Sequence, residues 1–364
     1  MLKRQEISCI RQSQYRFGRE NQLMITSNLD RNFQQFDLTF SITMYEKLLN
    51  EFLPIDLGEL RKPGFIKMML DQRDEQIKRV ESKRGFRKQE TCPISGSSEV
   101  TTFCKINDWL SVKYCREFDY GFASHFPNFV EDVYDSDNYL DSAVKSYDAT
   151  REYRKQRFGK ERVSIIQKFK KTGKVLDIGC GTGWCLEAFK DAGYNVVGQE
   201  LSPQLASFTQ ENFKIPTYNC SVSQIEDSFD VITMFDLIEH VPDPVELLND
   251  CKKILNPGGV ILAFTPNLDS YGIREMKEFS SLVIPPSHLH YFTPKSARKL
   301  SELVDLEFVF CETRGMDIAD LASLYELRGD QKSCDSIREN FDSLQACVDQ
   351  AGCANHMRFV LRLS

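Results

Sequence analysis

Hydrophobic and polar positions in residues 174–202 predict a strand, a tight turn, a helix and a second strand. A short apolar run that contains Asp177 is followed by three alternating glycines, a stretch with helical spacing, and a second apolar run that ends at Glu200. Glycine permits a sharp turn and lets a ligand come close to the backbone. This order is typical of a βαβ unit of a parallel sheet.

A similar pattern continues toward the carboxyl end of the chain. Ser202 and Pro203 have the residue types of a helix cap and a first helical position, so we expect a helix to begin there. Helical stretches and apolar runs of strand length alternate, which predicts an α/β fold. The further runs are residues 216–222, 229–235, 255–267, 306–313 and 357–363.

The first 88 residues follow a different pattern. Residues 36–44 alternate strictly between apolar and polar positions, which predicts a half-buried strand, and residues 45–52 predict a short helix. Residues 63–84 carry apolar side chains on one side of a second predicted helix. The end of that helix is locally basic, which we interpret as a solvated helix end; contact with RNA or an anionic substrate is the alternative.

Composition and charge narrow the classes of function. The chain has 364 residues, a net charge of −7 and a pI near 5.5, so binding of nucleic acid over its whole surface is not indicated. It has no run of about 18 apolar residues, so we expect no membrane span, and its first residues lack the apolar core of a signal peptide. The twelve cysteines are scattered, often in apolar patterns, which predicts reduced thiols in the cytoplasm.

The glycine turn indicates which nucleotide it could bind. Its spacing is G-x-G-x-G, and Trp184 stands where the dinucleotide fingerprint G-x-G-x-x-G has its third glycine. Asp177, just before the glycines, would repel a pyrophosphate but would favour an ammonium or sulfonium group. Glu200 stands at the end of the second strand, where an acid accepts hydrogen bonds from the hydroxyls of a ribose. These features disfavour NAD.

Residues 174–202 resemble the glycine motif and the following acidic strand end of class I S-adenosylmethionine-dependent methyltransferases, of the small-molecule group called types 11, 12 and 23. Three more stretches extend the resemblance: FDVITMFDLIEHVPDP at 229–244, LNPGGVILAF at 255–264 and HLHYFTP at 288–294. The resemblance covers about residues 89–364. It implies a Rossmann-like seven-stranded sheet with an antiparallel last strand and helices on both faces, to which this chain adds an N-terminal α+β extension.

The resemblance also implies that S-adenosylmethionine is the cofactor. The glycine turn would hold its methionyl end, Asp177 would order the ammonium region, and Glu200 would accept from the ribose hydroxyls. Residues after the fourth strand would line the methyl group. The implied cofactor-binding residues are Asp177, Gly179, Cys180, Gly181, Gly183, Glu200, Leu201, Ser221, Phe235, Asp236 and Leu237.

Methyl transfer requires orientation and desolvation, and an oxygen acceptor also requires a base. The candidates are His290, then His240 and His288, because a neutral imidazole near pH 7 can take the proton of a hydroxyl. Alternatively, His288 and His290 cap the following helix or form hydrogen bonds within their loop. A metal ion would need a third ligand that the sequence does not place, so we expect no metal.

Residues 89–125 contain scattered cysteines. Many bacterial methyltransferases that this chain resembles have a small zinc ribbon here, with the pattern C-P-x-C-G followed by C-x-x-C-G. In this chain Cys92 and Cys115 remain, whereas Ser95 and Phe118 stand where the second cysteine of each pair would be. A structural zinc site requires four ligands. We therefore expect a degenerate ribbon that keeps its shape without a metal ion.

The predicted function is that of an S-adenosylmethionine-dependent methyltransferase (EC 2.1.1) that methylates a hydroxyl oxygen of a small molecule, such as a metabolite or a sugar. Carbon methylation is the second alternative, and RNA as acceptor is the third. A fold that binds without catalysis and a nucleotide-binding oxidoreductase are alternatives from other classes. The intact glycine turn with Glu200 argues against the first, and the glycine spacing argues against the second.

Four segments are expected along the chain. Residues 1–88 form an extension without a recognised role, residues 89–125 form the ribbon-like segment, and residues 126–170 form lid and entry helices. The methyltransferase core occupies residues 171–364 and contains a helical insertion at 314–355. The insertion is expected to cover the active-site face or to form a contact in a homo-oligomer. Such lid segments diverge freely, so the sequence does not name the acceptor.

Overall fold

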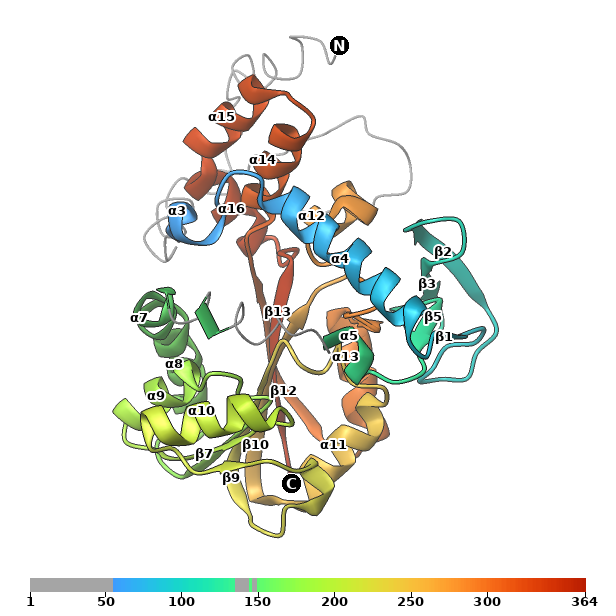
Figure 1. Ribbon diagram of the computed structural model, residues 1–364. Coiled ribbons are helices and arrows are strands. Elements are labelled where there is room, and N and C mark those ends of the chain that lie inside the picture. Colours follow the sequence, from blue (N-terminus) through green and yellow to red (C-terminus); the bar gives the residue numbers. More distant parts are fainter. Residues whose placement is uncertain (1–54, 135–143, 146–148) are drawn as a thin grey trace, which may run out of the picture. The chain divides into compact units, whose positions relative to one another are not determined.

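The central sheet of the computed structural model has seven strands in the order β12-β13-β10-β9-β6-β7-β8 (Figure 1). The structure describes residues 55–134, 144–145 and 149–364, which lie in one compact unit. The strands are β6 (Lys174–Ile178), β7 (Asn195–Gln199), β8 (Thr217–Tyr218), β9 (Phe229–Phe235), β10 (Leu255–Pro266), β12 (Glu307–Arg314) and β13 (His356–Arg362).

All neighbouring strands from β10 to β8 are parallel, whereas β13 runs antiparallel to both β10 and β12. The predicted α/β fold with an antiparallel last strand is therefore confirmed. After β6 the chain passes to β7 and β8 on one side, and it then returns to β9 on the other side. The carboxyl ends of β6 and β9 thus form the switch point where such sheets bind ligands.

Alternating side chains of the inner strands fill two separate cores, one on each face of the sheet. Val175 and Val231 lie in one core, and their neighbours Leu176 and Ile232 lie in the other. Strands buried on both faces show nearly continuous apolar runs, as these do.

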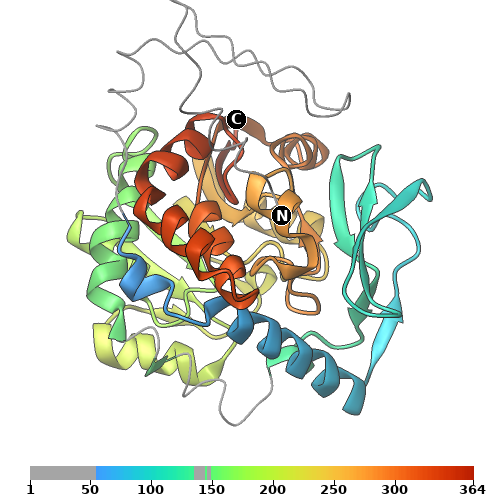
Figure 2. The same ribbon diagram turned by 90° about the horizontal axis from the view of Figure 1, so that it is seen from above.

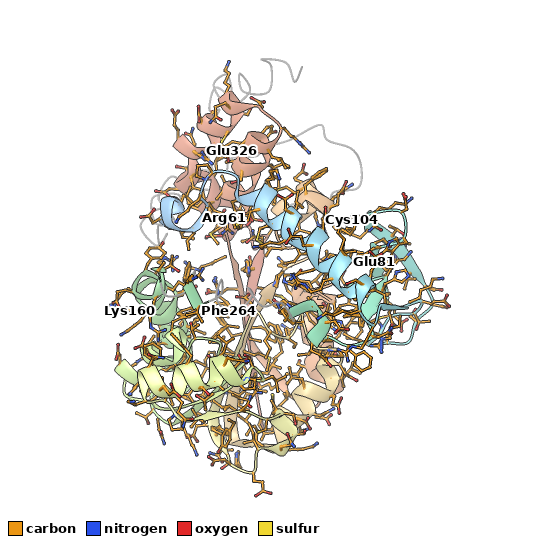
Figure 3. The ribbon with its side chains drawn as sticks, viewed as in Figure 1. Arg61, Glu81, Cys104, Lys160, Phe264 and Glu326 are labelled. Carbon is orange, nitrogen blue, oxygen red and sulfur yellow. The ribbon has the colours of Figure 1, made fainter. Side chains whose placement is uncertain are left out.

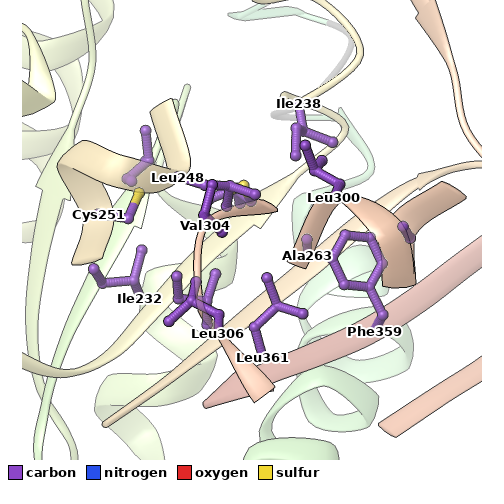
Figure 4. Packing of buried hydrophobic residues seen from close by; sticks show 14 of the residues in the cluster. Ile232, Ile238, Leu248, Cys251, Ala263, Leu300, Val304, Leu306, Phe359 and Leu361 are labelled. Carbon is purple, nitrogen blue, oxygen red and sulfur yellow. The ribbon is translucent and has the colours of Figure 1, made fainter. Parts of the chain in front are cut away.

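Helices cover both faces. On one face α8 (Lys160–Gln167) and α9 (Trp184–Asp191) contribute to the core with Val175. On the other face α11 (Pro244–Lys253) and α13 (Pro294–Leu303) pack on β9, β10 and β13 through side chains such as Leu248 and Leu300 (Figure 4). The prediction of helices on both faces is confirmed.

Several helices begin where the sequence provides a cap. Ser202 Oγ accepts from the N–H of Leu205, and Pro203 is the first residue of α10 (Pro203–Phe213), as predicted. Asp243 caps α11 in the same way, and Thr293 caps α13. The alternative in which His288 and His290 cap α13 therefore does not hold, because Thr293 fills that role.

A smaller antiparallel sheet of four strands, in the order β11-β4-β3-β2, lies beside the core on the face of α11 and α13. Its strand β11 comes from the HLHYFTP stretch, so this stretch joins the N-terminal part of the chain to the central domain. The strands are β2 (Val100–Lys105), β3 (Ser111–Cys115), β4 (Tyr120–Ala123) and β11 (His290–Tyr291); β1 (Phe86–Lys88) and β5 (His125–Pro127) pair separately.

The insertion between the last two strands is helical, as predicted. It consists of α14 (Asp317–Leu327), α15 (Gln331–Glu339) and α16 (Phe341–Gln350). The amphipathic helix α4 (Phe65–Ser82), predicted at residues 63–84, runs alongside α14 (Figures 1 and 2). Arg61 Nε donates to Asp320 Oδ1 at 2.5 Å and so ties the segment before α4 to the insertion (Figure 3).

Shorter elements complete the described chain. They are α3 (Leu57–Leu60), α5 (Glu131–Tyr134), α7 (Arg151–Arg154), a π-helical turn (Lys155–Gly159), α12 (Tyr271–Met276) and two short 3₁₀ helices (Val222–Gln224 and Lys277–Phe279). None of the helices in the described part of the chain is long and apolar enough to cross a membrane.

One strand prediction was too long, and others lie outside the described residues. Only Thr217–Tyr218 of the predicted strand 216–222 pairs with β7, because the chain turns away at Asn219 and enters a 3₁₀ helix. The predictions for residues 36–44 and 45–52, and part of the predicted lid at 126–170, fall outside the residues that the structure describes.

Candidate functional site

The glycine turn between β6 and α9 has the left-handed backbone conformation at Gly179, Gly181 and Gly183, with φ of 66°, 54° and 73°. A Cβ added to Gly183 would lie 2.7 Å from Thr209, so this glycine is required for packing. A Cβ on Gly181 would meet no atom of the described residues within 4 Å. The space beside Gly181 is therefore open to a ligand.

Glu200 follows β7 directly and faces the glycine turn. Its Oε2 accepts from the N–H of Gly181 at 3.0 Å, and its Oε1 accepts from the N–H of Ser202 at 2.9 Å. A carboxylate has about four acceptor sites, so Glu200 keeps capacity for further hydroxyl donors. Leu201 is mostly exposed beside it, and Ser221 is exposed near the end of β8.

Gln199 is a buried residue that the sequence analysis did not single out. Its Oε1 accepts from the N–H of Gly179 at 3.2 Å, and its Nε2 donates to the carbonyl of Cys220 at 2.7 Å. It therefore joins the glycine turn to the segment after β8. The sequence does contain a signal for this role, because a glutamine stands in an otherwise apolar strand, one residue before Glu200.

Asp177 lies beneath the turn, in β6. Its side chain is buried, and Thr233 Oγ1 on the neighbouring strand β9 donates to its Oδ1 at 2.6 Å. Burial raises the pKa of Asp177 to about 7, although Thr233 and the nearby Arg162 act in the opposite direction. A cationic group above the turn would favour the charged form of this acid.

The loop after β9 packs against the glycine turn. A Cβ on Gly179 would lie 2.8 Å from Leu237 Cδ1, so the two segments are in close contact. Phe235 forms an edge-to-face contact with Phe264, at 5.1 Å between ring centroids. Asp236 is exposed, and its Oδ1 lies 3.6 Å from His356 Nε2.

Glu239, three residues after Asp236 in the same loop, is fully buried. Thr265 Oγ1 donates to its Oε2 at 2.9 Å, whereas its Oε1 has no hydrogen-bond partner among the described residues. Burial and the nearby Asp236 raise the pKa of Glu239 above its usual range. The carbonyl of Glu239 accepts from the N–H groups of Leu289 and His290, at 2.8 and 3.1 Å.

These backbone bonds bring His288 next to His240. The two rings meet edge to face, with 4.7 Å between centroids. His240 Nδ1 lies 2.8 Å from the carbonyl of Ser287 and 2.8 Å from Tyr134 Oη, and His288 Nδ1 lies 2.8 Å from the carbonyl of Leu282. A carbonyl only accepts, so both rings carry their proton on Nδ1 and have a lone pair on Nε2.

His290 has a different environment, although it is only two residues from His288. It is fully buried, its Nε2 donates to the carbonyl of Val241 at 2.8 Å, and its Nδ1 bonds with the hydroxyl of Tyr120. Burial lowers the pKa of His290 to about 4. Both ring nitrogens are therefore engaged inside the protein.

Residues 149–309 match a family model described as a methyltransferase domain. The strands β6 to β10, the glycine turn and Glu200 all lie within this range. The chain is therefore similar to methyltransferases over this part of its length.

Curated relatives and solved structures are similar to this chain over part of its length. A ubiquinone biosynthesis O-methyltransferase from Idiomarina loihiensis is 30% identical over 158 residues, which are 41% of this chain and 63% of that protein. One of the same name from Actinobacillus pleuropneumoniae is 30% identical over 144 residues, or 36% and 59%. The chain thus spans less than two thirds of each. A solved S-adenosylmethionine-dependent methyltransferase from Archaeoglobus fulgidus aligns over 58% of this chain and 97% of its own, with 20% identity and a TM-score of 0.42.

The residues around the glycine turn fit S-adenosylmethionine. Gly181 leaves open space above the turn, Glu200 retains acceptor capacity for a ribose, and Asp177 places an acid beneath the position of a cation. The N–H groups of Gly179 and Gly181 are already held by Gln199 and Glu200. They therefore keep the turn in shape.

The predicted site residues form two groups. The predicted cofactor residues gather around the glycine turn and the start of the loop after β9. Of the three predicted histidines, His240 and His288 come together, and His290 lies apart. Glu239, Tyr134 and His356 were missed as members of this neighbourhood, although Glu239 stands in the motif D-x-x-E-H.

Cys92 and Cys115 lie in the same hydrophobic core. Ser95 connects them, because its N–H donates to Cys92 Sγ at 3.5 Å and its Oγ lies 3.8 Å from Cys115 Sγ. Phe118, which stands where the ribbon pattern has a cysteine, has a buried ring. Cys104 belongs to a different cluster, where burial raises its pKa to about 12.

Proposed function

We propose that this protein is an enzyme that transfers the methyl group of S-adenosylmethionine to a hydroxyl oxygen of a small molecule. The observation that carries the proposal is the contact between Leu237 and Gly179. It joins the glycine turn to the loop that bears Asp236, Glu239 and His240, so a cofactor site and a set of proton acceptors lie next to each other.

Bound S-adenosylmethionine would supply an electrophilic methyl group on a sulfonium. Glu200 would accept hydrogen bonds from the ribose, and Gly181 would let the cofactor approach the backbone. Asp177 would interact with the cationic end from beneath the turn. Phe235 and Leu237 would exclude water from the methyl group, because both belong to the wall formed by the loop after β9.

The acceptor hydroxyl would bind at the histidine cluster formed by His240 and His288. Their Nε2 lone pairs are the ones left free by the carbonyls that fix each Nδ1. His290 is the weaker candidate for a base, because its two nitrogens are already bonded within the protein. Asp236 and His356 would face the same acceptor from the other side of the loop.

Oxygen as the accepting atom is supported by the relatives. Both curated proteins described above are named as O-methyltransferases. The match to the methyltransferase family model covers residues 149–309, which contain the glycine turn and the histidine cluster. A small-molecule acceptor agrees with the net charge of −7, which does not favour nucleic acid.

We place the activity in the cytoplasm. Most described cysteines are buried in apolar surroundings as free thiols, among them Cys115, Cys180, Cys185 and Cys251. Such thiols are typical of proteins from a reducing compartment.

The proposal is tested by incubating the full chain with methyl-labelled S-adenosylmethionine and a panel of hydroxylated metabolites, sugars and phenols. We expect label on oxygen for one class of acceptor, and a loss of about 10²–10⁴-fold in rate for His240→Ala or His288→Ala. His125→Ala, a histidine outside the cluster, is the matched control. Transfer to carbon, or cofactor binding without transfer to any acceptor, would contradict the proposal.

A further inference from the structure

We propose that Glu239, His240 and His288 together bind a divalent transition-metal ion. Two imidazole nitrogens and one carboxylate oxygen form a ligand set that zinc, iron(II) and manganese accept, with further positions open to substrate. No metal was expected from the sequence, because His288 and His290 stand there without a third ligand. In the structure His240 takes the place of His290 beside His288, and Glu239 supplies the third ligand.

The three side chains converge on one point. One donor atom from each lies within 4.8 Å of the others. His240 Nε2 lies 3.8 Å from Glu239 Oε1. A tetrahedral ion with bonds of about 2.1 Å spaces its ligand atoms roughly 3.4 Å apart, so binding requires only a small inward movement of these side chains.

The histidines have the orientation of metal ligands. Metal-binding histidines usually donate their other N–H to a carbonyl or a carboxylate, which fixes the tautomer. His240 donates to the carbonyl of Ser287, and His288 donates to the carbonyl of Leu282. Each therefore presents an Nε2 lone pair, and Glu239 is supported in the same manner by Thr265.

The buried carboxyl group of Glu239 has no cationic side chain beside it among the described residues. Glu239 has no exposed surface, and none of the described lysines or arginines forms an ion pair with it. Its Oε1 lacks a hydrogen-bond partner among the described residues. Burying an uncompensated carboxylate is costly, and a bound cation would offset that cost.

A purely structural role explains this arrangement less well. A protonated Glu239 could donate from Oε1 to His240 Nε2, but the distance of 3.8 Å is too long for a hydrogen bond. The backbone also holds the ligands in place, because the N–H groups of Leu289 and His290 bond to the carbonyl of Glu239. A site fixed by such supporting bonds is preorganised for an ion.

The role of the ion rests on the proposed function. With the Nε2 lone pairs of His240 and His288 bound to the ion, these two rings would no longer act as bases. The ion would instead bind the acceptor hydroxyl and lower the pKa of that group, so that the O–H bond breaks and the proton passes to solvent. The oxygen would then form the new bond to the methyl carbon as the carbon–sulfur bond breaks, leaving S-adenosylhomocysteine. The acceptor class is therefore an alcohol or a phenol whose oxygen can reach a metal.

The test uses cobalt(II) as the probe, added to the full chain after treatment with a chelator. We expect about one Co²⁺ per chain after dialysis, measured by elemental analysis, with the visible absorption of a nitrogen- and oxygen-ligated ion. Glu239→Gln and His288→Ala should each weaken binding by at least about tenfold. His125→Ala should bind like the wild type, and circular dichroism should confirm that each variant is folded.

If Glu239→Gln fails to fold, His240→Ala and His288→Ala decide the question. Wild-type protein without bound cobalt, or variants with unchanged cobalt content, would overturn the inference. A strong near-ultraviolet thiolate band would do the same, because it would assign the ion to cysteines. Calorimetry with S-adenosylmethionine separates the two proposals. If the protein binds the cofactor but no metal, the metal site is overturned and the proposed function stands. If it binds a metal but no cofactor, the proposed function is overturned and the metal site stands.

Discussion

At the scale of single residues, the distinction that matters most is between His290 and the pair His240 and His288. His240 stands in the motif at 229–244, and His288 and His290 stand in the motif at 288–294. The hydrogen bonds of each ring nevertheless differ. His290 is bonded through both nitrogens, to Tyr120 and to Val241, whereas the other two each keep one lone pair. The environment of each ring therefore separates a structural histidine from candidates for chemistry.

This assignment predicts the effect of Tyr120→Phe. The substitution leaves His290 Nδ1 without its partner in the core, so the free energy of unfolding should fall by about 1–3 kcal/mol. Methyl transfer and cofactor affinity should stay near the wild-type values, because neither depends on that bond. Urea unfolding and a methyl-transfer assay measure the two quantities, and a large loss of activity at unchanged stability would identify His290 as the base.

At the scale of elements, the glycine turn needs close packing at one glycine and open space for a ligand at another. Gly183 is packed against Thr209, so a side chain there would disturb the start of α9. Gly181 borders open space, so a side chain there would meet the ligand instead. Gly183 thus allows the turn to pack against α10, and Gly181 leaves room for a ligand.

Gly181→Ala should therefore lower both stability and cofactor affinity, whereas a glycine replaced away from the ligand should lower stability alone. The left-handed φ of 54° costs an alanine about 1–2 kcal/mol of folding free energy. The added methyl group should weaken S-adenosylmethionine binding by more than tenfold, because it occupies the approach to the backbone. Gly193→Ala is the matched control, since Gly193 also has a positive φ but follows α9. Equal cofactor affinity in both variants would show that the ligand does not approach Gly181.

At the scale of the whole molecule, local patterns predicted the fold well. Apolar runs and caps such as Ser202 are contained in a few neighbouring residues, and these elements appeared where they were expected. The strand after α10 is shorter than predicted. The chain leaves the sheet at Asn219, whose side chain donates to the carbonyls of Glu200 and Leu201. No local pattern encodes that contact.

The histidine cluster was only partly predictable for a similar reason. His288 meets His240 because Leu289 and His290 bond to the carbonyl of Glu239, about 50 residues earlier in the chain. Tyr134 reaches His240 from 106 residues away. The motifs D-x-x-E-H and H-L-H show which residue types are present. The contact between His240 and His288, however, depends on the pairing of β11 with the small sheet beside the central domain.

The central claim is that the glycine turn and Glu200 bind S-adenosylmethionine, and calorimetric titration tests it most directly. Wild-type protein should bind with a free energy on the order of −8 kcal/mol, which corresponds to micromolar affinity. Glu200→Ala should lose most of this affinity, and Glu211→Ala, which removes an exposed glutamate of α10, should retain it. Absence of binding in the wild type, or equal binding in Glu200→Ala, would contradict the account.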